Sequence, residues 1–120
     1  MSDKVRVLVV GCGNMGASHA RAYHQLDRFE IAGLVSRGAS KEKLNAEFDN
    51  AYALFDDYDV ALKESGATAV SINTYPDTHY EYAKKGLAAD CHLFMEKPIA
   101  ETVEQASEIV ELSRAANKKI

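Results

Sequence analysis

Apolar positions along the chain follow two patterns that alternate from one end to the other. Short, nearly continuous apolar runs are typical of strands buried on both faces, and longer segments carry apolar residues at helical spacing. Strands are predicted at Val5–Val10, Phe29–Val35, Tyr52–Phe55, Ala67–Ile72 and His92–Met95. Helices are predicted at Met15–Leu26, Lys41–Phe48, Asp57–Glu64, Asp77–Ala88 and Thr102–Ala116.

This alternation indicates βαβ units, and therefore an α/β fold with a doubly wound parallel sheet of the Rossmann type. A length of 120 residues suits one domain, which we place at residues 1–120. The last residue, Ile120, follows a long helix at the point where such a fold continues with a strand. We therefore expect this chain to be cut before a second α/β domain.

Composition and charge narrow the class of protein. With 47% apolar residues the chain can bury a core, and a net charge of −4 argues against nucleic acid or an anionic membrane surface as partner. No apolar run approaches the length of a membrane span, and the N-terminus lacks a cleavage site, so we expect neither membrane insertion nor a signal peptide. Cys12 and Cys91 form no C-x-x-C pair, which suits a cytoplasmic protein. Because the four histidines are scattered, no metal site is expected.

A glycine-rich stretch, Val9-Val10-Gly11-Cys12-Gly13-Asn14-Met15-Gly16, lies between the first predicted strand and the first predicted helix. In this context the G-x-G-x-x-G pattern is typical of dinucleotide binding. Gly11 would allow the tight turn, Gly13 would let the backbone approach a pyrophosphate, and Gly16 would let helix and strand pack closely. The alternative is an ordinary strand–helix turn without a ligand.

The second predicted strand ends in Val35-Ser36-Arg37-Gly38, where NAD-binding versions of this fold usually hold a carboxylate. Arg37 could pair with a 2′-phosphate and Ser36 could donate a hydrogen bond to it, so this end favours NADP over NAD. If Arg37 is only a solvated loop charge, either cofactor would bind.

Two polar clusters follow the fourth and fifth predicted strands, at residues 73–79 and 95–98. Because open parallel sheets bind ligands beyond the carboxyl ends of their strands, both clusters are candidate site residues. Lys97 could have a catalytic or ligand-binding role there. Glu96 either tunes the Lys97 ammonium or is a neighbouring loop charge.

The three motifs together resemble the glucose–fructose oxidoreductase and inositol dehydrogenase family. They are Gly11-x-Gly13-Asn14-Met15-Gly16-x-x-His19, Thr74-Tyr75-Pro76-Asp77-Thr78-His79 and Glu96-Lys97-Pro98. The resemblance covers nearly the whole chain and is carried by the N-terminal, NAD(P)-binding domain of that family. It departs at Tyr75, where the family commonly has proline.

The resemblance implies an NAD(P)-dependent dehydrogenase or reductase that acts on sugars, polyols and related carbinols. A second domain, absent here, would bind the small-molecule substrate and drive homo-oligomer formation, so this chain alone would be inactive. The implied catalytic residue is Lys97, and Ser36 with Arg37 matches the NADP-type variant. Implied cofactor-binding residues are Gly11, Gly13, Asn14, Met15, Gly16, Ser36, Arg37, Thr74, Tyr75, Pro76, His79, Glu96 and Lys97.

Two other functions remain open from the sequence. A stand-alone, non-enzymatic NADP(H)-binding sensor or interaction module would need the same glycine-rich loop. A degenerate Rossmann scaffold that binds nothing is disfavoured because all three motifs are intact.

Overall fold

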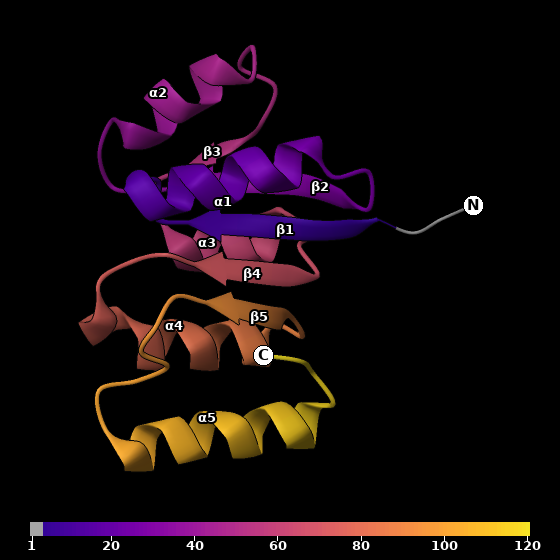
Figure 1. The fold of residues 1–120 in the computed structure, drawn as a ribbon. Helices are drawn as coiled ribbons and strands as arrows, with labels where there is room; N and C mark the ends of the chain where they lie inside the picture. Colours follow the sequence, from indigo (N-terminus) through magenta and orange to yellow (C-terminus); the bar gives the residue numbers. More distant parts are fainter. Residues whose placement is uncertain (1–3) are drawn as a thin grey trace.

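Parallel strands form one sheet in the order β3-β2-β1-β4-β5 in the computed structural model, which describes residues 4–120 (Figure 1). The strands are β1 (Val5–Val10), β2 (Phe29–Val35), β3 (Leu54–Phe55), β4 (Ala69–Ile72) and β5 (His92–Met95). The helices are α1 (Asn14–Gln25), α2 (Ser40–Glu47), α3 (Tyr58–Glu64), α4 (Pro76–Ala88) and α5 (Val103–Ala116). The predicted parallel α/β fold is confirmed. Residues 1–3, on which the expectation of no signal peptide partly rests, lie outside the described range.

The strand order reverses at β1, which pairs with β2 on one side and with β4 on the other. The chain thus winds outward from β1 in one direction and then in the other. In an open parallel sheet this reversal leaves a crevice beyond the carboxyl ends of the two central strands. The fold therefore directs any ligand to the loops that follow β1 and β4.

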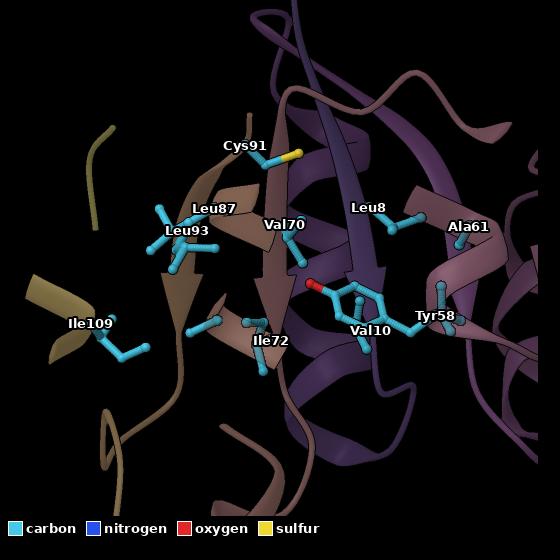
Figure 2. Close-up of a cluster of buried hydrophobic side chains, with 12 residues drawn as sticks. Leu8, Val10, Tyr58, Ala61, Val70, Ile72, Leu87, Cys91, Leu93 and Ile109 are labelled. Atoms are coloured by element: carbon cyan, nitrogen blue, oxygen red, sulfur yellow. The ribbon is translucent and has the colours of Figure 1, made fainter. Parts of the chain in front are cut away.

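The buried core has two halves, one on each face of the sheet. Successive side chains of a strand point to opposite faces, so Val7 and Val9 pack with α1 and α2, while Leu8 and Val10 pack with α3, α4 and α5. Figure 2 shows the second half, in which Tyr58 of α3 lies against β1 and β4. The nearly continuous apolar strands follow from this burial on both faces.

Several strands and helices begin or end at residues other than those predicted. Strand β3 has only two residues, because Asn45 bonds both the backbone N–H and the carbonyl of Tyr52 and holds that residue outside the ladder. Strand β4 begins at Ala69 rather than Ala67. Helix α4 includes Pro76, because proline has no N–H to leave unpaired at a first helical position.

Helix α1 buries a different face from the one that its large apolar residues suggest. Met15 and Leu26 are half exposed, whereas Ala17, Ala20 and Tyr23 are buried. Small side chains let the helix approach the sheet closely, so alanine rather than methionine or leucine marks the packed face. Of the apolar residues near helical spacing that predict this helix, Met15, Ala22, Tyr23 and Leu26, only Tyr23 is buried.

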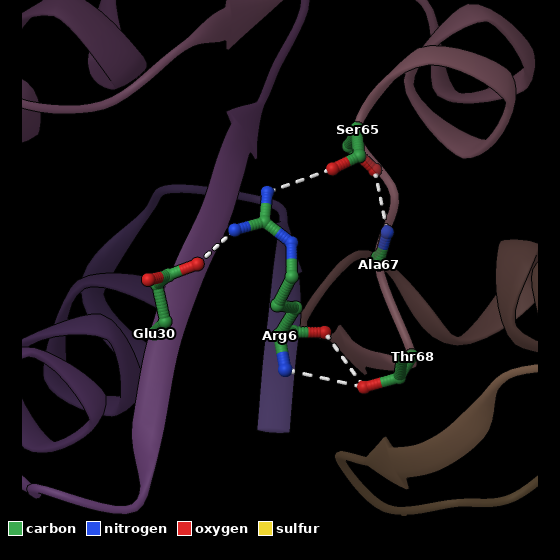
Figure 3. A network of polar contacts seen from close by, with 5 residues as sticks. All are labelled: Arg6, Glu30, Ser65, Ala67 and Thr68. Atoms are coloured by element: carbon green, nitrogen blue, oxygen red, sulfur yellow. Dashed lines mark hydrogen bonds and ion pairs between the residues drawn. The ribbon is translucent and has the colours of Figure 1, made fainter. Parts of the chain in front are cut away.

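Arg6 lies near the amino end of β1, at the end opposite the crevice, and is the centre of a network of polar contacts (Figure 3). Its guanidinium pairs with Glu30 of β2 and donates to the Ser65 carbonyl at 2.8 Å. Its backbone N–H donates to the Thr68 hydroxyl at 3.1 Å. The network joins β2 to the connection between α3 and β4 without approaching the candidate site.

The start of α5 is close to the capping box that Thr102, followed three residues later by Gln105, favours. The Thr102 hydroxyl accepts a hydrogen bond from the Gln105 N–H at 3.1 Å, as an N-cap side chain should. The Gln105 side chain accepts from the Glu101 N–H, one residue before the expected Thr102 N–H. In the described part of the chain, no helix is long and apolar enough to cross a membrane.

Candidate functional site

A cavity of about 1070 Å³ lies at the carboxyl ends of the strands, where the sheet reverses. The glycine-rich loop after β1, the loop after β2, the start of α3 and the loop after β4 form its walls. Seven of the residues predicted for the site line it, namely Gly11, Gly13, Asn14, Ser36, Arg37, Thr74 and Tyr75. The fold thus gathers three segments that are far apart in the sequence.

Two of the three glycines are required by the chain's own packing. Gly11 has a φ of +89°, and a Cβ there would lie 2.7 Å from the Asn73 carbonyl oxygen. A Cβ on Gly16 would lie 1.7 Å from the Gly11 carbonyl oxygen. These two positions allow the turn and the close approach of α1 to the sheet, as the sequence predicts.

Gly13 is different, because a Cβ added there would meet no atom of residues 4–120 within 4 Å. Its backbone is extended, with φ −75° and ψ −159°, so no positive φ demands glycine. Helix α1 begins just after it, and no side chain caps the first turn. The free N–H groups of that turn therefore meet open cavity, which fits a phosphate group at a helix N-terminus.

The loop after β2 carries the predicted cationic end of the site. The Ser36 hydroxyl donates to the Gly38 carbonyl at 3.0 Å, and Arg37 is exposed at the cavity wall. Arg37 forms no ion pair with any of residues 4–120. Its guanidinium is therefore available to an anionic ligand.

Lys41 is a nearby cation that the sequence analysis did not single out. It is 6% exposed, and its ammonium donates to the Gly38 carbonyl at 2.9 Å. It also pairs with Asp56 at 2.6 Å and with Glu42 at 3.3 Å. The hydrogen bond to Asp56 raises the pKa of the Lys41 ammonium above its ordinary value. The sequence gives no signal for this lysine, because its position on α2 predicts a solvated charge. Its burial is evident only in the structure.

The loop after β4 leads Thr74 and Tyr75 into the cavity wall, and Tyr75 is 82% exposed. The hydroxyls of Thr74 and Thr78 are hydrogen-bonded, and the Thr78 hydroxyl also donates to the Tyr75 carbonyl at 2.6 Å. Pro76 starts α4 and does not line the cavity. These bonds hold the loop in one conformation beside the glycine-rich turn.

His79 does not face the cavity, in contrast to the role predicted for it. The side chain is fully buried. Its Nδ1 lies 2.6 Å from the Pro98 carbonyl oxygen, and its Nε2 lies 3.0 Å from the Thr74 carbonyl oxygen. Both ring nitrogens therefore contact backbone carbonyl oxygens, and His79 joins the loop after β4 to the loop after β5.

Asn73, another residue that the sequence analysis did not single out, offers an unused acceptor at the same wall. Its Nδ2 donates to the carbonyl and the hydroxyl of Ser71, both at 3.1 Å. Its Oδ1 is buried and has no hydrogen-bond partner among the described residues. A buried acceptor without a donor costs free energy, so this atom marks a point where a ligand donor or water fits.

Glu96 and Lys97 follow β5, outside the lining of the cavity. Lys97 is exposed and precedes a cis peptide bond to Pro98. Glu96 bonds His19 of α1, with 3.1 Å between Oε2 and Nε2. The expectation that Glu96 tunes the Lys97 ammonium is not supported, since its carboxylate is directed to α1 instead.

Cys12 lies in the glycine-rich turn as a packing residue. Its thiol donates to the Val35 carbonyl at 3.6 Å, and burial raises the pKa of the thiol to about 11. No group of three or more His, Cys, Asp or Glu side chains that could hold a metal ion occurs among residues 4–120. The cavity is therefore lined by glycine backbone, hydroxyl groups, the cations Arg37 and Lys85, and the carboxylates of Asp56, Asp57, Asp59 and Asp77.

Comparisons with known proteins agree with this geometry. A family model described as an oxidoreductase family with an NAD-binding Rossmann fold matches residues 5–120. The inositol 2-dehydrogenase of Paracoccus denitrificans is 32% identical over 119 residues, which cover 97% of this chain and 35% of that protein. The D-glucoside 3-dehydrogenase of Escherichia coli is 31% identical over 119 residues, covering 98% of this chain and 34% of that protein.

Solved structures share the same fold. The crystal structure of GenD2 from gentamicin A biosynthesis in complex with NAD superposes with a TM-score of 0.91 at 24% identity. That match covers 98% of this chain and 34% of GenD2. The chain thus spans about a third of the length of the relatives that it matches.

Proposed function

This chain belongs to the oxidoreductase family with an NAD-binding Rossmann fold, and from that premise we propose that it is the cofactor-binding part of an NAD(P)-dependent dehydrogenase. The motif resemblance to the inositol dehydrogenase family is thereby confirmed. The proposed substrates are sugars, polyols or related carbinols, by analogy with the names of the two relatives above. A second domain would bind that substrate and form the homo-oligomer.

The observation that carries the proposal is the open backbone cradle at Gly13. The chain's own packing explains Gly11 and Gly16 but gives no reason for a glycine at position 13. A pyrophosphate bound against the first turn of α1 supplies that reason, because a side chain there would occupy its place.

We assign the remaining predicted roles by resemblance and position. The nicotinamide, when bound, supplies hydride chemistry, and the protein supplies binding and orientation. Lys97 would donate a hydrogen bond to the reacting oxygen of the substrate and move its proton. Exposure of Lys97 at the carboxyl end of β5 supports this role, since its ammonium is open to a substrate on that side.

The finer proposal is a preference for NADP over NAD. It is supported by Arg37, which lines the cavity without an ion-pair partner among the described residues, and by the absence of a carboxylate at the end of β2 itself. A guanidinium pairs with a phosphate in two hydrogen bonds, and Ser36 adds a hydroxyl donor. Tenfold tighter binding of NADPH than of NADH corresponds to about 1.4 kcal/mol.

The test compares this chain with its Gly13→Val variant by titration with NADPH and NADH, followed by nicotinamide fluorescence. The variant should keep its circular dichroism spectrum and thermal midpoint, because the added side chain meets no protein atom near its Cβ. Binding of both cofactors should fall at least tenfold. Ala115→Val, which adds bulk on the exposed face of α5, is the matched control and should bind like the wild type.

Two results would contradict the proposal. A folded wild-type chain that binds neither cofactor would leave a Rossmann scaffold without a ligand. Unchanged binding by Gly13→Val would remove the pyrophosphate assignment. The alternative function, a stand-alone NADP(H) sensor, predicts the same binding. A fall in turnover on Lys97→Ala in a longer protein that carries this domain would rule it out.

A further inference from the structure

Asp56 stands beside Ser36 at the carboxyl edge of the sheet. The register of β2 and β3 pairs Val35 with Phe55, so the next residues of the two strands are neighbours. The Ser36 N–H still donates to the Phe55 carbonyl at 3.2 Å, which keeps the two chains together at this point. A carboxylate that β2 lacks is therefore supplied by the strand next to it.

The Asp56 side chain is 81% exposed and lines the cavity together with Ser36 and Arg37. Among residues 4–120 it forms one ion pair, with Lys41 at 2.6 Å. The lysine is the fixed member of the pair, because it is buried and anchored to the Gly38 carbonyl at 2.9 Å. The carboxylate is the member that can move away into solvent.

Negative charge is in slight excess at this end of the cavity. Asp56 and Asp57 line it with Arg37, and Lys41 and Glu42, which do not line it, form ion pairs next to it. Two of these five groups are cations and three are carboxylates, so one negative charge is in excess while the Asp56 carboxylate is in place. Withdrawal or neutralisation of that carboxylate removes the excess and makes this end more favourable to a phosphate group.

We propose that Asp56 determines cofactor selectivity through its interaction with the substituent on the 2′-oxygen of the adenosine ribose. The proposal rests on the cofactor site proposed above. A free 2′-hydroxyl donates to the Asp56 carboxylate while Lys41 stays paired. A 2′-phosphate is repelled by Asp56, and it binds Arg37 and Lys41 only after it has displaced that carboxylate. Asp56 therefore favours NAD and limits the preference for NADP that Ser36 and Arg37 create.

The experiment uses four versions of this chain: wild type, Asp56→Asn, Glu42→Gln and Lys41→Met. Dissociation constants are measured for NADH and NADPH by nicotinamide fluorescence. Displacement by AMP and by adenosine 2′,5′-bisphosphate then isolates the ribose end. Glu42→Gln is the matched control, because Glu42 also pairs with Lys41, at 3.3 Å, but does not line the cavity.

We expect Asp56→Asn to shift the ratio of the two dissociation constants about tenfold toward NADPH, with weaker NADH binding and tighter NADPH binding. Glu42→Gln should shift it by no more than about twofold. Lys41→Met should shift the ratio toward NADH. AMP and adenosine 2′,5′-bisphosphate should show the same change of ratio in Asp56→Asn, because these two probes differ from each other only at the 2′ position.

An unchanged ratio in Asp56→Asn, or an equal shift in Glu42→Gln, overturns the proposal. Equal loss of both cofactors in folded Asp56→Asn also overturns it, because Asp56 would then be a general ribose contact. Its exposure makes misfolding of this variant a poor explanation, and circular dichroism checks the fold. A wild type that prefers NADH refutes the preference for NADP alone, while the shift in Asp56→Asn still supports the role of Asp56.

Discussion

Replacement of His79 by leucine tests whether this residue holds the two ligand-facing loops together. Leucine fills a similar buried volume but donates no hydrogen bond. The Thr74 and Pro98 carbonyl oxygens lie 3.0 Å and 2.6 Å from the ring nitrogens, and a neutral imidazole has a single N–H, which donates to one of them. Leucine therefore leaves a buried carbonyl without its donor, at a cost of about 1–3 kcal/mol. We expect the free energy of unfolding to fall by about 1–3 kcal/mol.

Such a loss is a substantial part of the free energy of unfolding of a typical domain, which is about 5–15 kcal/mol. Urea unfolding followed by circular dichroism measures it. With a slope of about 2 kcal/mol per molar urea, the middle of the usual range, the midpoint should fall by about 0.5–1.5 M.

His24→Leu is the control for this experiment. His24 is exposed and makes one hydrogen bond, 2.6 Å from its Nδ1 to the Tyr52 hydroxyl. Its loss should cost less than about 1 kcal/mol, as for other exposed contacts. If His79→Leu destabilises the chain no more than His24→Leu does, the interpretation of His79 as a joint between the loops is wrong.

Two further predictions follow from burial around the glycine-rich turn. Gly16→Ala should prevent folding or lower the thermal midpoint sharply, because its Cβ would lie 1.7 Å from the Gly11 carbonyl oxygen, and a native-like melting curve would contradict this. Cys12, with a thiol pKa of about 11, should react with iodoacetamide at pH 8 roughly a hundredfold more slowly in the folded chain than after unfolding. Burial raises the pKa of this thiol above its ordinary value of 9.0, so its contribution to the free energy of unfolding is full below pH 9 and is lost as the pH rises to about 11. Equal alkylation rates in folded and unfolded protein would refute the burial argument.

Two of the three motifs, the glycine-rich turn and residues 74–79, contribute residues to the cavity wall, whereas Glu96-Lys97-Pro98 lies outside that lining. Gly11, Gly16 and the strand ends were placed correctly because the steric needs of a tight turn and of helix–strand packing are local. The role of His79 was predicted wrongly, and Asp56 and Lys41 were not predicted, because their contacts are not local. His79 contacts the Pro98 carbonyl, 19 residues away, and Asp56, which follows β3, pairs with Lys41 of α2.

The sequence by itself determined the α/β class, the run of strands and helices, and the glycine-rich turn, since periodicity and the missing Cβ of glycine act within a few residues. Tertiary structure decided the partners: Glu96 with His19, His79 with two backbone carbonyls, and Asp56 with Lys41. The order β3-β2-β1-β4-β5 and the register between its strands set these encounters. Strand order follows from packing of the whole sheet against its helices, so the pattern within a single segment does not encode it.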